Sequence, residues 1–368
     1  MLDVAIVGAG PVGLHLGALL LQAGLSVRIL EQLPAPRPES RAIGIHPPAL
    51  AALALAGVAA PVLAEGVHIT AGTARSGGSE VGRVAFDPPV LTLKQVRTEA
   101  ILARRVSQLD PGALVRGFCL KTLHDGGTFL TLSASHGTHI QARLVVGADG
   151  ARSAVRRLLG IATGGRDHPD TYLMGDFPDT GSDGATAVLH LEPGGIVESF
   201  PLPDGLRRWV AHTDSLLEGA DAATLARIIL ARTGMSVDAG ANSMLSAFGV
   251  RTRLARRMVQ GRVALVGDAA HEISPIGGQG MNLGWLDAAA LAPIVVDALA
   301  GRATGARLAG FERDRMGAAR TAARQAQLNM VLGRAMPPSF LQWRNGVLGR
   351  IFTLPSAQNL VARRFTMQ

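Results

Sequence analysis

The amino-terminal end of the chain carries a glycine-rich motif between a short apolar strand and a helix. Val4–Val7 is a β-branched, apolar run, the motif at Gly8–Gly13 reads Gly-Ala-Gly-Pro-Val-Gly, and a helical pattern follows it. A second predicted strand, Val27–Leu30, ends in Glu31, where an acid accepts hydrogen bonds from an adenosine ribose. In such a unit one glycine makes a tight turn, the next lets a pyrophosphate approach the backbone, and the third lets helix and strand pack closely. The sequence therefore predicts a dinucleotide-binding domain at this end.

Composition excludes several other classes of protein. The 368 residues are 48% apolar and 17% charged, which excludes a disordered chain and allows one large or two fused domains. The single cysteine, Cys119, excludes an intramolecular disulfide and a cysteine-rich metal site. Asp3 stands where a signal peptide would be basic, and the apolar run 49–64 is shorter than the roughly 20 residues of a spanning helix. We expect a soluble, cytoplasmic protein without a transmembrane segment.

Basic charge is concentrated at the carboxy-terminal end. The chain has a net charge of +8, and residues 302–368 alone hold eleven Arg and two acids, so the rest of the chain has a net charge of −1. This segment lacks the interleaved aromatics and motifs of a nucleic-acid module, so we expect solvated faces of carboxy-terminal helices and no nucleic-acid partner. Peripheral contact of these basic helices with an anionic membrane stays open.

Two further motifs follow along the chain. A predicted strand at Ala142–Val146 runs into Asp149-Gly150 and a basic helix start, and a second strand runs into Gly267-Asp268 and then into the loop Pro275–Asn282. That loop has three glycines in four residues and opens a helix, so its bare N–H groups and the helix dipole would stabilise negative charge above it. The alternative is a glycine-rich helix start with only a packing role.

Together the three motifs resemble, in order and content, the fingerprints of the flavoprotein aromatic hydroxylases. These are the class A FAD monooxygenases of the p-hydroxybenzoate hydroxylase type, and the branch with phenol, polyketide and ubiquinone-pathway hydroxylases is the most similar. The resemblance covers roughly residues 1–300. It implies an α/β fold in which a Rossmann-like, glutathione-reductase-type FAD-binding domain is interleaved with a β-sheet substrate domain and followed by carboxy-terminal helices. The implied domains are 1–70, 98–165 and 255–300 for FAD, 71–97 and 166–254 for substrate, and 301–368 for the helical segment.

The resemblance also implies roles for individual residues. Around the cofactor it places Gly8, Gly10 and Gly13 at the FAD pyrophosphate, Glu31 at the adenosine ribose, Arg41 beside the flavin and its phosphates, Arg97 near the ribityl phosphate, Asp149 in the motif that serves FAD and the nicotinamide cofactor, Asp268 at the ribityl hydroxyls, and Gly280, Met281 and Asn282 at the flavin. The catalytic loop residues are Pro275, Gly277 and Gly278.

The implied activity is that of an FAD-dependent monooxygenase. NADPH or NADH reduces the flavin, dioxygen adds to give a flavin hydroperoxide, and one oxygen passes to an electron-rich aromatic or polyketide-like small molecule. The middle stretch, 171–214, alternates strands and turns and reads as an antiparallel sheet over the nucleotide domain. Its candidate substrate contacts are Tyr172, His190, Glu198, Trp209 and His212.

Other functions have less support. His136 and His139 have no third ligand nearby, so no metal site is expected. The open alternatives are an FAD-dependent reductase or saturase of the geranylgeranyl-reductase kind, and a non-catalytic FAD-binding scaffold. A flavin halogenase is less favoured, because its Trp-rich motif is absent. The sequence leaves the substrate and the oligomeric state open.

Overall fold

The computed structural model describes residues 1–36 and 41–368 of the chain. The α-helices are α1 (Pro11–Gln22), α2 (Pro47–Leu55), α3 (Ala59–Glu65), α4 (Gln95–Leu109), α5 (Ala154–Leu158), α6 (Ala222–Thr233), α7 (Gln279–Leu299), α8 (Gly305–Gly333), α9 (Pro338–Phe352) and α10 (Pro355–Thr366). Two 3₁₀ turns are η1 (Ala239–Ala241) and η2 (Gly267–Ala269). The strands are β1 (Leu2–Val7), β2 (Val27–Glu31), β3 (Gly44–Ile45), β4 (Val67–Ser76), β5 (Ser79–Thr92), β6 (Leu114–Arg116), β7 (Leu120–Asp125), β8 (Leu130–Ala134), β9 (His139–Gly147), β10 (Thr163–Pro178), β11 (Thr186–His190), β12 (Val197–Leu202), β13 (Leu206–Thr213), β14 (Met244–Ala255), β15 (Val259–Gln260), β16 (Val263–Leu265) and β17 (His271–Glu272).

The first sheet, sheet A, carries the amino-terminal motif at its centre. Its order is β15-β16-β9-β1-β2-β6, with β7 and β8 joined to it through β9, and β1 runs parallel to both β2 and β9. Val4, Ala5 and Ile6 are fully buried, as expected for a strand of a parallel sheet that is covered on both faces. Helix α1 packs between α4 and α7 beside this sheet.

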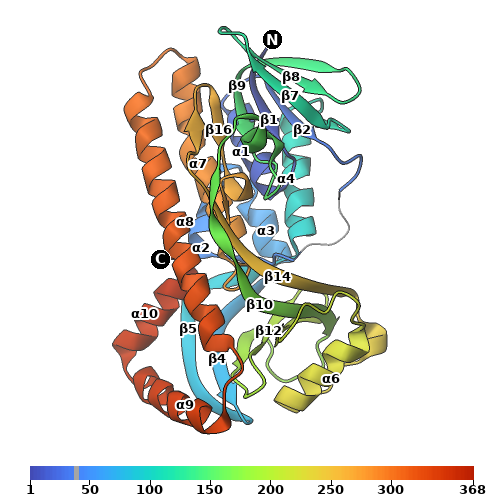
Figure 1. Ribbon diagram of the computed structural model, residues 1–368, viewed down its shortest axis with the longest axis vertical. Helices are drawn as coiled ribbons and strands as arrows, with labels where there is room; N and C mark the ends of the chain where they lie inside the picture. The colour runs from blue at the N-terminus through green and yellow to red at the C-terminus, as the bar shows by residue number, and fades with distance from the viewer. Residues whose placement is uncertain (37–40) are drawn as a thin grey trace.

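The second sheet, sheet B, lies below sheet A in Figure 1. Its nine strands follow the order β17-β14-β10-β13-β12-β11-β4-β5-β3. The long antiparallel strands β10 and β14 run from sheet B toward sheet A, and α8 lies along the left side of both (Figure 1). On one face, Trp209 and Leu173 pack against α6. On the opposite face, Tyr172 and Val210 form an apolar cluster with Ile276 and with Met330 of α8.

The predicted α/β fold class is confirmed, and two elements differ from the sequence expectation. The helical stretch 48–63 is divided into α2 and α3, because Gly57 adopts φ +74°. Glycine adopts this left-handed conformation readily, and the conformation ends a helix. The sequence analysis does not predict α6. The predicted domain boundaries stay a prediction. Sheet A draws its strands from 2–31, 114–147 and 259–265, and sheet B from 44–45, 67–92, 163–255 and 271–272.

Helix α7 is the one helix among the described residues that is long and apolar enough, by length and composition, to cross a bilayer. Of its most apolar window, 56% is buried inside the protein. Trp285 and Asp287 are both fully buried, and Asp287 is engaged in ion pairs. These are the properties of the core helix of a globular domain.

Candidate functional site

The turn between β1 and α1 has two glycines that make close contacts and one that faces open space. A Cβ atom on Gly8 would lie 2.4 Å from the carbonyl oxygen of Ala148, and one on Gly13 would lie 2.0 Å from the carbonyl oxygen of Gly8. Any side chain there would push the turn away from β9. A Cβ on Gly10, by contrast, meets nothing within 4 Å, and no side chain caps the amino terminus of α1. The free N–H groups of this helix end therefore face open space that suits an anion, and this space is called the cofactor cleft below.

The three sequence motifs meet around this cleft. A Cβ on Gly284 of α7 would lie 2.4 Å from Val12 and 3.2 Å from the Cα of Gly267, so α7 touches the first and the third motif together. The Trp285 indole N–H donates a hydrogen bond to the carbonyl oxygen of Pro11 at 3.0 Å. The second motif joins them, because Arg156 donates to the carbonyl oxygen of Ala269 at 2.8 Å.

Glu31 lies at the end of β2 beside the glycine turn. Its carboxylate accepts backbone N–H groups of Ala9 and Leu33, both at 2.9 Å. These bonds fix the carboxylate at the edge of the cleft, next to the loop that the sequence predicts to hold a pyrophosphate.

Asp268 lies in η2, between sheet A and α7. Its side chain is exposed to solvent although protein atoms surround it on most sides, as expected for a carboxylate at the floor of an open cleft. These surroundings raise its pKa, with opposite contributions from His271 and Asp287. Among the described residues no donor hydrogen-bonds to this carboxylate, and a Cβ on Gly280 would lie 3.9 Å from its Oδ1. Asp268 is therefore a free acceptor at the cleft floor.

A buried ion cluster centred on Asp287 holds this turn in place. The Asp287 carboxylate accepts the Gly267 N–H at 3.0 Å, the His271 Nε2–H at 2.6 Å and the Arg315 Nε–H at 2.6 Å. Burial alone would lower the pKa of His271, but the charge and hydrogen bond of Asp287 outweigh it and raise that pKa. Burial would likewise raise the pKa of Asp287, but His271 and Arg315 outweigh it and lower that pKa. The two pKa shifts both favour the charged forms of His271 and Asp287.

The predicted catalytic loop is a tight turn that opens α7. Gly277 and Gly278 adopt φ +94° and +67°, and Gly278 N–H donates to the carbonyl oxygen of Pro275 at 2.9 Å. No side chain caps the amino terminus of α7. His46 lies against the loop, and burial lowers its pKa to about 4, opposed by the backbone of Gly277 and Gly278, so the imidazole is neutral at pH 7.

Asn282 has a structural role in this loop. Its Oδ1 accepts the His46 N–H at 2.8 Å, and its Nδ2 donates to the carbonyl oxygens of Gly44 at 2.9 Å and Gly278 at 2.7 Å. The amide clamps the loop to the segment before α2. Met281, the neighbouring residue, packs against the main apolar core.

Three other predicted cofactor residues have protein partners. Arg97 forms an ion pair with Glu65 at 2.9 Å. Asp149 accepts N–H groups at the start of α5, including that of Ala154 at 2.6 Å. Arg41 donates to Ser246 Oγ at 3.1 Å and lies 5.2 Å above the Phe248 ring, so it faces sheet B. Their predicted contacts with a cofactor stay predictions.

The face of sheet B toward the loop contains buried polar groups without partners. Glu198 pairs in register with Val210, and Tyr172 pairs with His212, so all four side chains lie on the Ile276 side. Glu198 is 9% exposed and has no hydrogen-bond or ion partner among the described residues. Burial raises its pKa to about 7. The Tyr172 hydroxyl is buried without a hydrogen-bond partner in the same part of the chain, and burial and the charge of Glu198 raise its pKa.

The structure does not bring the five predicted substrate residues together. His190 stacks on Trp209 with ring centres 6.0 Å apart, and both lie on the α6 face, away from the loop. His212 lies on the loop side, where its Nε2 is 3.7 Å from Asp170. Of the five candidates, only Tyr172, Glu198 and His212 therefore have geometric support for a role at the loop.

Several functional residues are absent from the sequence-based assignments. Asp287 and Trp285 position two of the motifs, and His46 lies against the loop. A buried acid in an otherwise apolar helix is the one signal that could have identified Asp287.

Comparisons with known proteins agree with this geometry. The family model described as FAD binding domain matches residues 1–326. Rifampicin monooxygenase from Streptomyces venezuelae is 35% identical over 298 residues, which cover 78% of this chain and 62% of the relative. The chain therefore spans about three fifths of the length of that relative.

Two further relatives extend the comparison. The 12-dehydrotetracycline 5-monooxygenase/anhydrotetracycline 6-monooxygenase of Streptomyces rimosus is 32% identical, with 90% of this chain and 69% of the relative covered. Among solved structures, p-nitrophenol 4-monooxygenase from Pseudomonas putida superposes with a TM-score of 0.88 at 24% identity, covering 99% of this chain and 97% of the other. At that identity the likeness concerns the fold.

The Asp287 cluster gives a prediction for stability. Asp287→Asn leaves His271 and Arg315 buried without their counter-charge, so the free energy of unfolding should fall by about 3–5 kcal/mol in urea titrations at pH 6. The lowered pKa of Asp287 provides stability that is lost as pH falls below 3.8, and the raised pKa of His271 provides stability that is lost as pH rises above 6.5. The deficit of the variant should therefore be largest between these values.

The matched control is Asp314→Asn, which breaks an exposed ion pair with Arg313 and should change stability by less than about 1 kcal/mol. Equal effects of the two variants would refute a central role for Asp287.

Proposed function

Because the chain belongs to the FAD binding domain family, we propose that it is an FAD-dependent monooxygenase that uses NADPH or NADH and dioxygen to hydroxylate an aromatic or polyketide-like small molecule. The observation that carries the proposal is the meeting of three motifs at one cleft, with open space at Gly10 and a free acceptor at Asp268. The relatives described above are monooxygenases, which favours this function over a reductase or a non-catalytic scaffold.

The residues of the cleft fit FAD. The amino terminus of α1 at Gly10 would hold the pyrophosphate, Glu31 the adenosine ribose, and Asp268 the ribityl hydroxyls. A carboxylate of raised pKa without a donor gains most from hydroxyl donors, because they stabilise its charged form. When bound, FAD supplies the redox chemistry, taking two electrons from NADPH or NADH and reacting with dioxygen.

The loop 275–280 contributes electrostatic stabilisation. The uncapped amino terminus of α7 and the backbone N–H groups around Gly277 and Gly278 carry partial positive charge, which stabilises an anion above the loop. His46 is neutral, so it adds no charge of its own, and Asn282 keeps the loop in register with the start of α2. Pro275 accepts the turn hydrogen bond that fixes Gly278.

Glu198 and Tyr172 provide the polar contacts for a substrate. A phenolic hydroxyl placed between them would donate its proton to a Glu198 carboxylate oxygen and accept a hydrogen bond from the Tyr172 hydroxyl. Proton loss raises the electron density of the aromatic ring, which favours attack on an electrophilic oxygen. Met174, Val210 and Phe248 supply an apolar wall for the rest of the molecule.

The reaction can be tested with the FAD-loaded protein, NADPH or NADH, and labelled dioxygen. Anhydrotetracycline and rifampicin are suitable probes, because relatives named for them match this chain. We expect substrate-stimulated oxidation of the nicotinamide cofactor and a product with one labelled oxygen atom. Reduced product without labelled oxygen would support the saturase alternative, and absence of flavin reduction would support the scaffold.

The control for this reaction is Asp268→Ala. Loss of one charged acceptor should weaken FAD binding about ten- to a hundredfold, because hydrogen bonds to charged groups contribute about 1.5–3 kcal/mol. Asp314→Asn, an exposed acid of α8, should bind FAD like the wild type. Unchanged FAD affinity in Asp268→Ala would reject the role of this carboxylate.

Glu198→Gln should separate catalysis from stability. The carboxyl has a folded pKa of about 7 against an ordinary value of 4.5, so its ionisation opposes folding above pH 4.5. At pH 8 the variant should therefore be more stable by about 1–3 kcal/mol, while kcat/KM for a phenolic substrate falls about a hundredfold and loses its rise with pH near 7.

The matched control is Glu192→Gln, another largely buried carboxyl, which accepts the Gly77 N–H outside the loop face. It should leave the pH profile of kcat/KM unchanged. A joint loss of stability and activity in Glu198→Gln would indicate a structural role for Glu198.

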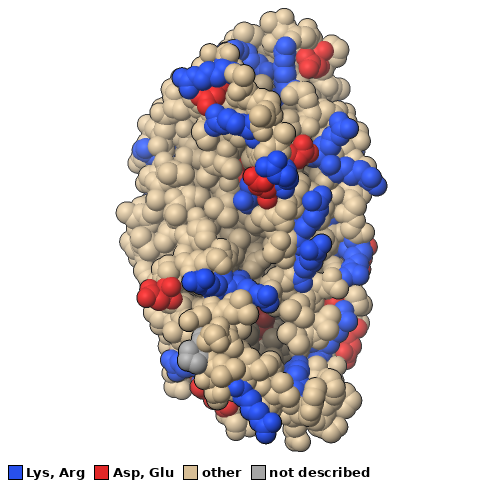
Figure 2. All heavy atoms as spheres, turned by 90° about the vertical axis from the view of Figure 1, so that its left-hand side faces the viewer, with Lys and Arg blue, Asp and Glu red and all other residues tan. Residues whose placement is uncertain are grey.

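We also propose that α9 and α10 make peripheral contact with an anionic membrane. Their apolar side chains exposed to solvent are Phe340 (53%), Trp343 (65%), Val347 (38%), Ile351 (41%), Leu360 (52%) and Val361 (37%). Arg350, Arg363 and Arg364 lie in the last turns of these helices. Figure 2 looks onto this side of the molecule, where basic side chains predominate over acidic ones. Aromatic, aliphatic and arginine side chains together are typical of interfacial helices. Cytoplasmic localisation stays a prediction.

Membrane contact can be measured by co-sedimentation with phosphatidylserine vesicles. Phe340→Ser/Trp343→Ser should lower the bound fraction at least fivefold, because it removes both exposed aromatic side chains of α9. Leu55→Ser, an exposed leucine of α2, is the control and should bind like the wild type. Equal vesicle binding of the wild type and both variants would contradict the proposal. So would a concentration-dependent dimer of the protein that forms in place of vesicle binding.

A further inference from the structure

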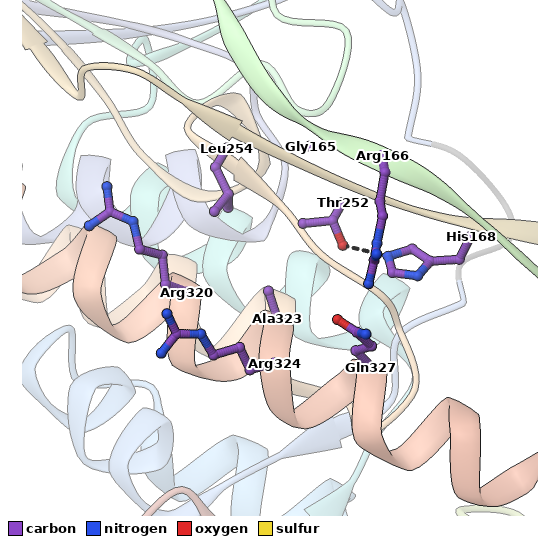
Figure 3. Close-up of a pocket in the computed structure, with 9 residues that line it drawn as sticks. All are labelled: Gly165, Arg166, His168, Thr252, Leu254, Arg320, Ala323, Arg324 and Gln327. Atoms are coloured by element: carbon purple, nitrogen blue, oxygen red, sulfur yellow. Dashed lines mark hydrogen bonds between the residues drawn. The ribbon is translucent and has the colours of Figure 1, made fainter.

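A second hollow lies between the long strands of sheet B and helix α8, outside the cofactor cleft. It has a volume of about 380 Å³. Its lining residues are Gly165, Arg166 and His168 of β10, Thr252 and Leu254 of β14, and Arg320, Ala323, Arg324 and Gln327 of α8. Figure 3 shows Arg320 and Arg324 extending from α8 on one side, with Arg166 and His168 on the other. The four α8 residues follow a helical spacing that places them on one face.

The hollow has a positive charge that no neighbouring acid neutralises. None of its nine lining residues is acidic, and Arg166, Arg320 and Arg324 have no hydrogen bond or ion pair with any described residue. Nearby arginines are paired: Arg253 with Asp167 at 2.6 Å, and Arg334 with Asp170 at 2.8 Å.

This arrangement has a cost in the free protein. Arg320 and Arg324 stand four residues apart on α8, where like charges destabilise a helix. Arg166 adds a third guanidinium from the opposite side. A bound anion would offset this repulsion.

The remaining lining groups favour a ligand with an apolar part. Leu254 and Ala323 belong to an apolar cluster that reaches Ile273 and Leu283, so the floor of the hollow is apolar. His168 shares a hydrogen bond of 3.0 Å with Thr252 Oγ1. Burial and the charge of Arg166 lower the pKa of His168, so the arginines carry the positive charge at neutral pH.

We propose that this hollow is a binding site for a diphosphate-bearing anion. The guanidinium groups stand on both sides, so a ligand must present anionic oxygens in two directions, and a diphosphate has two such centres. Guanidinium groups bind phosphate oxygens through paired N–H donors. The volume is within the range of small-ligand sites and exceeds the need of a single phosphate. One candidate source of the diphosphate is the reduced nicotinamide cofactor, and this assignment rests on the proposed function. A diphosphate from another molecule would bind here independently of the proposed function.

Titration of the FAD-loaded protein with inorganic pyrophosphate tests the site directly. We expect saturable binding by calorimetry at low salt, weakened at least tenfold in Arg320→Gln/Arg324→Gln and also weakened in Arg166→Gln. The control is Arg307→Gln/Arg313→Gln, which removes the same charge from α8 at residues that pair with Asp297 and Asp314 outside the hollow. The control should bind like the wild type. Absence of saturable binding, or equal affinity in the two double variants, would overturn the proposal.

The source of the diphosphate is decided by rapid reduction of the flavin with NADPH and NADH. If the nicotinamide cofactor occupies the hollow, Arg320→Gln/Arg324→Gln should raise its apparent Kd at least tenfold at an unchanged limiting rate, and pyrophosphate should compete. Unchanged reduction alongside weakened pyrophosphate binding would assign the site to another diphosphate. A wild-type protein that oxidises neither NADPH nor NADH would refute the proposed function. The pyrophosphate titration would still test the binding site independently.

Discussion

The buried carboxylate of Asp287 is the constraint on which the site depends. It receives the Gly267 N–H, the His271 imidazole and the Arg315 guanidinium, and so joins η2, β17, α7 and α8 at one point. A buried charge is tolerated only when it is paired and hydrogen-bonded on all sides. Because these partners come from separate segments, satisfying Asp287 also fixes where Asp268 lies and how α7 approaches the glycine turn.

The cleft itself results from the absence of side chains at specific contacts. Gly8 and Gly284 allow backbone or side-chain atoms to approach within 2.4 Å of where a Cβ would stand, so three motifs far apart in sequence meet closely. Gly10 has no such contact, and the space beside it is open. Glycine therefore has two roles in one site: it permits close packing at two positions and leaves room for a ligand at a third.

The sequence predicts the strand, turn and helix at this end because the signal is local, and the phosphate contacts stay a prediction. The turn, the helix start and the acid at the end of β2 lie within one short segment, so their spacing alone indicates a phosphate-binding end. Substrate residues depend on strand register, which a one-residue slip reverses. His190 and Trp209 thus lie on the α6 face while Glu198 lies on the loop face. Asn282, a predicted cofactor contact, uses both polar atoms of its side-chain amide on the backbone, and its contact with the cofactor stays a prediction.

The carboxylates that protein atoms surround on most sides divide into paired and unpaired groups, and this division separates structure from function. Asp176 is fully buried and pairs with Arg208 at 2.6 Å and Lys94 at 3.4 Å, and Asp287 is paired on every side. Glu198 and Asp268 have raised pKa values and no partner among the described residues. An unpaired carboxyl in such surroundings destabilises the ligand-free protein. Its presence is best explained by a ligand that supplies the missing hydrogen-bond partners. Asp268 lies near Gly280 at the start of α7, and Glu198 lies on the face of sheet B that carries the Ile276 cluster, so the loop between Ile276 and Gly280 connects the two unpaired acids.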